Sequence, residues 1–174
     1  MDIENRVLLA KNGDKDMFTT LIKEKKEDLY RIAYMYVKNQ QDALDIVSET
    51  IYKAYFSINK LKNLKYFTTW LTKILINCCL DHLKKYNNTV PLHQNEDIAH
   101  KNIETSKEEL IDLYDAVDKL RDVYKSVIIL KYFEDMTINE IGEIMDKAPH
   151  NIKNYLHKAL VQLRIELKEG EKYE

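Results

Sequence analysis

The chain has 174 residues and a formal net charge of −2, and 45% of its residues are hydrophobic while 32% are charged. This balance is typical of a packed, soluble protein and excludes a largely disordered chain, while the length allows one domain or two small ones. Only 3 glycines and 2 prolines are present. A turn-rich sheet architecture needs more of both, so we expect helices.

The first half of the chain is predicted to form three helices. Apolar residues recur at spacings of three and four over residues 15–38, which predicts an amphipathic helix. The same pattern predicts helices over residues 41–57 and 67–86. Residues 58–66 have no clean period and are expected to form a loop. These elements together predict an N-terminal domain over residues 1–86.

The middle of the chain is predicted to be a linker. Residues 87–107 are polar, lose the helical periodicity and contain Pro91. A C-terminal domain is therefore expected over residues 108–174. The predicted fold class is all-α, with two small helical domains joined by a flexible linker.

The C-terminal domain is predicted to end in a helix-turn-helix. Thr137 and Glu140 have the spacing of a capping box, and Pro149 suits the first position of a helix. A helix break is a candidate at Arg121 and Asp122. The helices are expected over residues 108–133, 138–145 and 149–168. A short helix, a tight turn and a longer helix are the parts of a major-groove reader.

An acidic face is predicted on the second helix. Asp42, Asp45 and Glu49 follow the spacing i, i+3, i+7, opposite the apolar stripe, and Tyr52 extends the same face. A solvated surface is the ordinary explanation of such a set. The basic segment at residues 60–86, with six lysines and one aspartate, follows directly. Charge sorted in this way favours two partners of opposite charge.

The basic segment also contains aromatic residues. Lysines can hold backbone phosphates, and aromatic rings can stack on bases exposed from a melted duplex. The helical spacing of Trp70 with Leu71 and Ile74 favours a core position for this ring instead. The interleaved residues are Lys60, Lys62, Lys65, Tyr66, Phe67, Trp70 and Lys73.

The last predicted helix has an apolar and a polar face. The apolar stripe consists of Ile152, Leu156, Ala159, Leu160 and Leu163. The polar face consists of His150, Asn151, Asn154, His157 and Lys158, with Lys153 and Tyr155 at its flanks. Asparagine can pair with adenine edges, and lysine with guanine or phosphate. An ordinary surface helix would show a similar pattern, so the polar face alone does not distinguish it from a DNA-reading helix.

Three stretches in one order resemble a known family. They are DALDIVSETIYKAY (42–55), YFTTWLTKILINCCLDHLKK (66–85) and MTINEIGEIMDKAPHNIKNYLHKALVQLR (136–164). They resemble the small two-domain sigma factors of the extracytoplasmic-function (ECF) class. The resemblance implies a factor that binds core RNA polymerase and directs it to promoters. It also implies regulation by an anti-sigma factor, often anchored in a membrane.

The resemblance further implies roles for single residues. The helix matching residues 42–55 docks on the clamp helices of the largest polymerase subunit, which gives Asp42, Asp45 and Glu49 basic partners. Residues 60–86 melt and read the minus-ten element, and Asn77 occupies the base-reading position. The amide of Asn77 offers both a donor and an acceptor to a base edge. The last helix reads the minus-thirty-five element.

Two single residues and one turn depart from the family pattern. Leu61 lies in the minus-ten loop where an aromatic residue is frequent. Asp146-Lys147-Ala148 replaces a frequent Gly-Ile-Ser turn, and aspartate tolerates unusual turn dihedrals. Tyr155 stands at a frequent basic position of the recognition helix, which removes one phosphate contact. The promoter sequence therefore does not follow from the resemblance.

Two other classes of protein are alternatives. A one-component regulator with a helix-turn-helix would need a ligand pocket or a dimer interface within residues 1–110, and a helical adaptor would not need the polar face of the last helix. No metal, cofactor or small-molecule substrate is expected, because Cys78 and Cys79 are adjacent and no catalytic motif is present. The chain shows no membrane span or signal peptide, so we expect a cytoplasmic protein.

Overall fold

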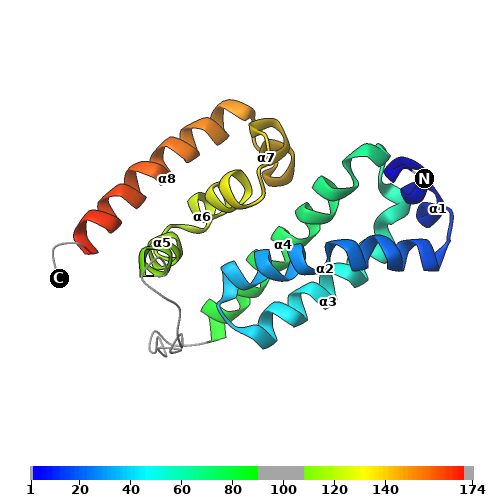
Figure 1. The fold of residues 1–174 in the computed structure, drawn as a ribbon, viewed down its shortest axis with the longest axis horizontal. Helices are drawn as coiled ribbons and strands as arrows, with labels where there is room; N and C mark the ends of the chain where they lie inside the picture. Colours follow the sequence, from blue (N-terminus) through cyan, green and yellow to red (C-terminus); the bar gives the residue numbers. More distant parts are fainter. Residues whose placement is uncertain (1, 90–107, 171–174) are drawn as a thin grey trace. The chain divides into compact units, whose positions relative to one another are not determined.

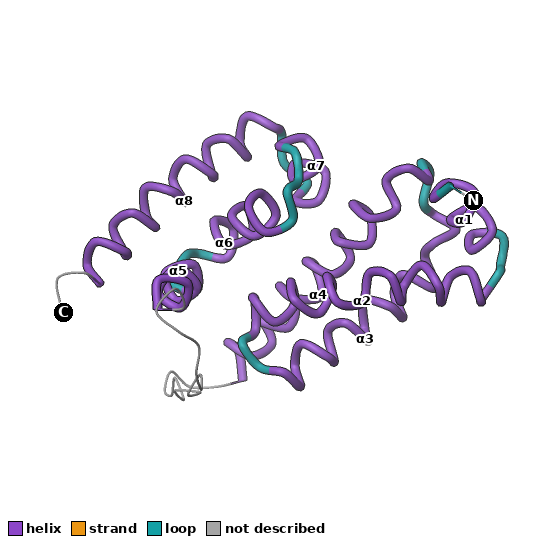
Figure 2. The backbone as a smooth tube through the Cα atoms, viewed as in Figure 1, coloured by secondary structure: helices purple, strands orange, loops and turns teal. Residues whose placement is uncertain are grey.

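The computed structural model describes residues 2–89 and 108–170, and all regular elements in these ranges are helices (Figures 1 and 2). The all-α prediction is confirmed. The chain divides into two compact units, built chiefly from α1 to α4 and from α5 to α8. Helix α4 continues to Thr89, three residues beyond the predicted end. The remainder of the predicted linker, 90–107, lies outside the described residues.

Helix α1 (Ile3–Lys11) is an element that the sequence pattern did not indicate. The side chain of Asp2 caps it by accepting a 2.8 Å hydrogen bond from the backbone N–H of Asn5. Val7 is fully buried and Ala10 nearly so. The helix packs on α2 and on both short turns that precede α4. Because an isolated nine-residue helix is marginal in water, this tertiary packing accounts for its formation.

Helices α2 (Lys15–Val37) and α3 (Gln40–Ser57) confirm the first two predicted helices. The side chains of Asp14 and Asn39 cap them, each accepting a 2.9 Å hydrogen bond from a backbone N–H of the first turn. Lys38 adopts a left-handed φ of 53° and ends α2, which lets α3 turn back along it. The two helices pack along each other within the N-terminal unit.

The predicted loop at 58–66 contains two short 3-10 turns, Ile58–Lys60 and Leu64–Tyr66. Helix α4 (Phe67–Thr89) follows and buries Phe67 and Leu75. Trp70 is half-buried, with its ring centroid 5.9 Å from that of Phe67, so its predicted core position is only partly realised. Both cysteines are buried thiols outside any disulfide, as expected from their adjacent positions in one helix.

The C-terminal unit contains α5 (Glu108–Asp118), α6 (Asp122–Ile128), a π turn (Ile129–Phe133), α7 (Ile138–Met145) and α8 (Pro149–Gly170). The predicted break near Arg121 is present between α5 and α6. Lys125 is almost fully buried, and its ammonium pairs with the carboxylate of Asp118. This ion pair joins α6 to the end of α5.

Candidate partner-binding surfaces

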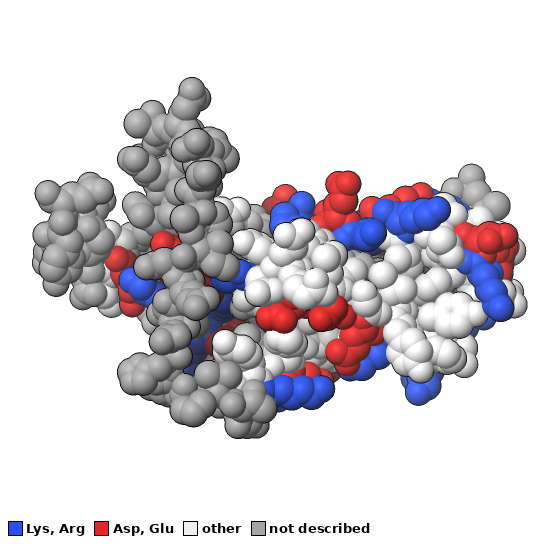
Figure 3. All heavy atoms as spheres, turned by 90° about the horizontal axis from the view of Figure 1, so that it is seen from below, with Lys and Arg blue, Asp and Glu red and all other residues white. Residues whose placement is uncertain are grey.

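The acidic set of α3 lies together on the exposed side of the helix. Asp45 and Glu49 are exposed, Asp42 is half-buried, and Tyr52 has 66% of its surface exposed. On the face seen in Figure 3, acidic side chains lie beside a broad uncharged surface. The structure thus brings together the four residues that the sequence singled out.

Each acid of this face already has a partner within the chain. His82 Nε2 lies 3.6 Å from Asp42 Oδ2, and Gln41 donates a 3.1 Å hydrogen bond to Asp45. The ammonium of Lys53 lies 2.7 Å from Glu49 Oε1. Exposed ion pairs are worth about 0–1 kcal/mol each, so a basic partner can displace them. These pairs were not predicted from the sequence, although the i, i+4 spacing of Glu49 and Lys53 was a signal for one of them.

Aromatic rings continue the acidic face toward the end of α3. Tyr52 and Phe56 have ring centroids 4.8 Å apart, and Tyr55 and Phe56 5.4 Å apart. Phe56 is 63% exposed and Tyr55 is 40% exposed. Clustered exposed rings of this kind are typical of protein interaction surfaces. Sequence reasoning found only Tyr52, although the aromatic spacing of YKAYF pointed to the other two.

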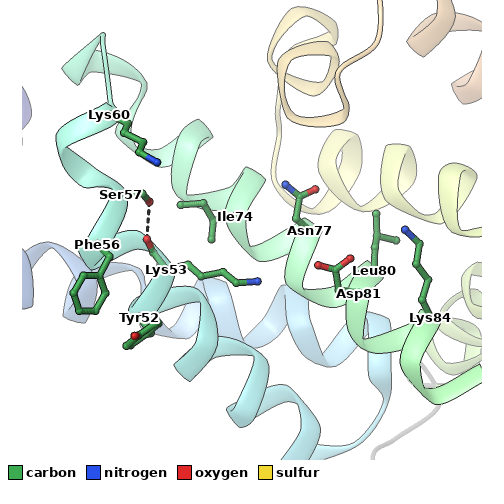
Figure 4. A pocket seen from close by; sticks show the side chains of 10 residues that line it. All are labelled: Tyr52, Lys53, Phe56, Ser57, Lys60, Ile74, Asn77, Leu80, Asp81 and Lys84. Atoms are coloured by element: carbon green, nitrogen blue, oxygen red, sulfur yellow. Dashed lines mark hydrogen bonds between the residues drawn. The ribbon is translucent and has the colours of Figure 1, made fainter. Parts of the chain in front are cut away.

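An open pocket of about 640 Å³ lies between α3 and α4 (Figure 4). Its lining residues are Tyr52, Lys53, Phe56, Ser57, Lys60, Ile74, Asn77, Leu80, Asp81 and Lys84. The side chain of Lys53 reaches from α3 toward α4, where Asn77 and Asp81 lie. A hydrogen bond to Glu49 raises the pKa of Lys53, so this side chain is a cation at neutral pH. Three lysines and one aspartate make the lining electropositive.

The predicted minus-ten residues occupy several places. Lys60 and Asn77 line the pocket described above. Leu61 is only 5% exposed, and its carbonyl accepts a 2.8 Å hydrogen bond from the ammonium of Lys11 in α1. Its side chain therefore belongs to the core of the unit and offers no surface to a partner. Outside the pocket lie Lys62, Lys65 and Tyr66, which are exposed, and Lys73, which is half-buried.

The turn that carries α8 depends on three backbone positions. Asp146 adopts a left-handed φ of 53°, and its N–H donates to the carbonyl of Gly142. Lys147 donates to the same carbonyl at 2.9 Å. A Cβ at Gly142 would lie 2.7 Å from the carbonyl oxygen of Lys147, so the close approach requires glycine. The predicted capping box of Thr137 and Glu140 is confirmed at the other end of α7.

The polar face of α8 is open to solvent. The exposed members are His150, Lys153, Asn154, His157 and Lys158, and Asn151 is half-buried. Tyr155 points away from this set and packs on Tyr124, with ring centroids 6.3 Å apart. Leu160 is 41% exposed, so it is a marginal member of the predicted apolar stripe. It lies about 80° around the helix from Ile152, at the edge of the buried side.

No described helix has a stretch both long and apolar enough to cross a membrane. Within 2–89 and 108–170, no group of three or more histidine, cysteine or acidic residues could hold a metal ion.

Comparison with protein families gives two matches in one order. The model of sigma-70 region 2 matches residues 21–89, and that of sigma-70 region 4 matches residues 110–163. The RNA polymerase sigma factor SigV of Bacillus subtilis (strain 168) is 38% identical over 160 residues, which are 90% of this chain and 95% of that protein. The ECF RNA polymerase sigma factor SigW of the same organism is 27% identical over 184 residues, 97% and 98% of the two chains.

Two solved structures share the fold. CnrH in complex with the cytosolic domain of CnrY has a TM-score of 0.74 at 17% identity, covering 96% of this chain and 97% of that one. The sigma factor RpoE of Bartonella quintana, in complex with the anti-sigma factor NepR, has a TM-score of 0.72 at 20% identity, with 87% and 96% covered. At these identities the likeness concerns the fold alone.

Proposed function

This chain belongs to the ECF class of sigma-70 factors. We propose that separate exposed surfaces of its helices bind core polymerase and the two promoter elements. As a sigma factor, the chain binds core RNA polymerase and directs it to promoters. Proteins of this family are transcription regulators and are not known as enzymes. Because the chain belongs to this family, the alternative predictions of a one-component regulator and of a helical adaptor are rejected.

The face of α3 is the proposed docking surface for core polymerase. Asp42, Asp45 and Glu49 supply negative charge, and Tyr52 leads into an exposed aromatic cluster. Charge complementarity with basic residues of the polymerase would set register, while the rings would bury apolar area at the centre of the contact. The charged and the aromatic parts are contiguous on one helix, which supports a single docking site.

The basic part of the N-terminal unit is the proposed minus-ten surface. Lys60, Lys62 and Lys65 are exposed beside Tyr66, and Lys73 lies further along α4. These cations can hold the backbone of a melted strand. Asn77 lines the pocket between α3 and α4, where its amide can pair with a base edge. Leu61 is left out of this surface because its side chain is buried.

Helix α8 is the proposed reader of the minus-thirty-five element. Asn154 stands at the centre of the exposed polar face, away from buried Ile152 and Ala159. Lys153 and Lys158 lie to either side of it, within reach of phosphates or a guanine edge. The remaining members, His150, Asn151 and His157, extend the same face.

Regulation and place in the cell are part of the proposal. The two similar structures are complexes, one of CnrH with the cytosolic domain of CnrY and one of the sigma factor RpoE with the anti-sigma factor NepR. By analogy, an anti-sigma factor would cover the α3 and α8 faces of this chain, held at the membrane by an anchor of its own. The sigma factor itself would act in the cytoplasm, where the polymerase and the chromosome are.

The order of the two matched regions carries the functional conclusion, and a transcription assay tests it. Core polymerase would be mixed with this chain on the DNA upstream of its own gene. A discrete run-off transcript that needs both components is expected, with core polymerase alone as the control. Transcription no higher than that of core alone on this and other candidate promoters would contradict the proposal.

A further inference from the structure

Lys53 belongs to two of the surfaces described above. Its ammonium lies 2.7 Å from Glu49 Oε1, a member of the acidic face of α3. The same ammonium lies 3.5 Å from the sulfur of Cys78 in α4, and the side chain lines the pocket that contains Asn77. Figure 4 shows this side chain extending from one helix toward the other. One cation therefore stands between the proposed polymerase face and the proposed minus-ten pocket.

The pocket suits a nucleotide of a single DNA strand. Its charged lining consists of Lys53, Lys60, Lys84 and Asp81, an excess of positive charge. The aromatic rings of Tyr52 and Phe56 lie at its edge and are largely exposed. Cations beside exposed rings are the combination that binds single-stranded nucleic acid through phosphates and stacking. In the free chain, however, Glu49 offsets the charge of Lys53.

We propose that Lys53 is an ion-pair exchange residue, which holds Glu49 in the free chain and contacts a promoter phosphate once Glu49 pairs with polymerase. The proposal rests on the proposed docking role of Glu49. It adds a DNA-contacting residue on α3 and a physical link between polymerase docking and promoter binding.

The exchange is feasible without any movement of the backbone. Both side chains are partly exposed, 43% for Lys53 and 46% for Glu49, so their mutual attraction is weak and easily replaced. Polymerase would supply a cation for Glu49, and the promoter strand an anion for Lys53. Since Lys53 already lines the pocket, rotation of its side chain is sufficient. No charge is left without a partner in the final complex.

The first test measures the affinity of each variant for core polymerase, and the loss of a lysine is expected to strengthen this binding. Removing Lys53 frees Glu49 for polymerase, so Lys53→Met should tighten core binding, by up to about fivefold, the scale of an exposed ion pair. In a Glu49→Gln background there is no pair to break, and Lys53→Met should leave core affinity unchanged. Four proteins complete this double-mutant cycle. Circular dichroism of each checks that the helices persist.

Promoter binding by the reconstituted holoenzyme gives the second readout. Lys53→Met should weaken it and reduce the slope of log affinity against log salt by roughly one, as expected for one lost phosphate contact. Lys53→Arg should restore affinity because the cation is kept. Lys26 is exposed on α2 and belongs to none of the proposed surfaces, so Lys26→Met is the matched control and should leave the slope unchanged.

Three results would overturn the exchange. The first is core affinity that is unchanged or weaker in Lys53→Met. The second is equal tightening in both backgrounds, which would indicate a general charge effect. The third is an unchanged salt slope of the holoenzyme. Failure of the docking role itself would look different, because Asp45→Lys with Glu49→Lys would then bind core polymerase as tightly as the native chain.

Discussion

Two exposed polar faces, on α3 and on α8, differ in how far their side chains are engaged within the chain. On α3, Asp42, Asp45 and Glu49 each have a partner in the same unit. On α8, the side chains of Lys153 and Asn154 form no hydrogen bond or ion pair with the residues that the structure describes. In the proposed roles, the acids of α3 would exchange these partners for basic residues of polymerase, whereas Lys153 and Asn154 would meet DNA with no internal pair to break.

The largest effect is expected from reversing charge on the α3 face. Asp45→Lys with Glu49→Lys turns attraction to the polymerase into repulsion and should weaken core binding on the order of 100-fold. Helicity should persist, because both side chains are exposed. The measurement is a titration of core polymerase, with circular dichroism in parallel. Glu27→Lys, an exposed acid on α2, is the control, and native affinity in the double variant would contradict the docking role.

A smaller effect is expected from one side chain of the α8 face. Asn154→Ala should cost about 1–3 kcal/mol at the cognate minus-thirty-five element and relax discrimination at one base pair. Since Asn154 is exposed, the domain should remain folded. Holoenzyme binding to a panel of single-base promoter variants measures the change. If Asn154→Ala lowered affinity equally for all promoter variants, Asn154 would be assigned to a contact with the DNA backbone and not to a base edge.

A phosphate contact should behave differently on the same helix. Lys153→Ala is expected to weaken all promoter sequences about equally and to reduce the salt slope by roughly one. The measurement is the same panel at two salt concentrations. A change of base preference in this variant would reverse the roles assigned to Lys153 and Asn154. Native behaviour of both variants would exclude α8 as the reader.

The smallest effect should come from a single neutral substitution on α3. Asp45→Asn removes one exposed charge and leaves the hydrogen-bonding shape similar, so core affinity should change by no more than about 1 kcal/mol. The same titration of core polymerase measures it. Together with the Asn154 result, it tests whether the α3 face acts through several weak pairs and the α8 face through single contacts. A large loss in Asp45→Asn would remove that distinction.

The helix ends that depend on local backbone geometry were predictable from the sequence. The capping box of Thr137 and Glu140 and the position of Pro149 at the start of α8 are both present. Helix α1 was not predictable, because only two of its residues are buried and its stability comes from α2 and the short turns. Tertiary contacts of this kind leave no periodic pattern in a nine-residue segment.

The candidate surfaces show the same division. Periodicity placed the acids of α3 and the polar residues of α8 on exposed faces, and these side chains are exposed or partly so. It could not show that Leu61 is buried, or that its carbonyl accepts a hydrogen bond from Lys11, fifty positions earlier in the chain. Nor could it show that His82 of α4 reaches Asp42 of α3. Contacts between distant segments depend on the packing of helices, which the spacing within one helix does not encode.

The construction of the turn before α8 has a consequence for protein engineering. The close approach of Gly142 to Lys147 and the left-handed Asp146 hold the helix through the backbone, and Ile152 and Ala159 anchor it from the buried side. None of these positions is on the exposed polar face. The scaffold and the proposed reading surface therefore use separate residues of one helix. A library that varies only the exposed face could retarget the factor to new promoters while the domain keeps its fold, provided that the glycine and the buried side are left intact.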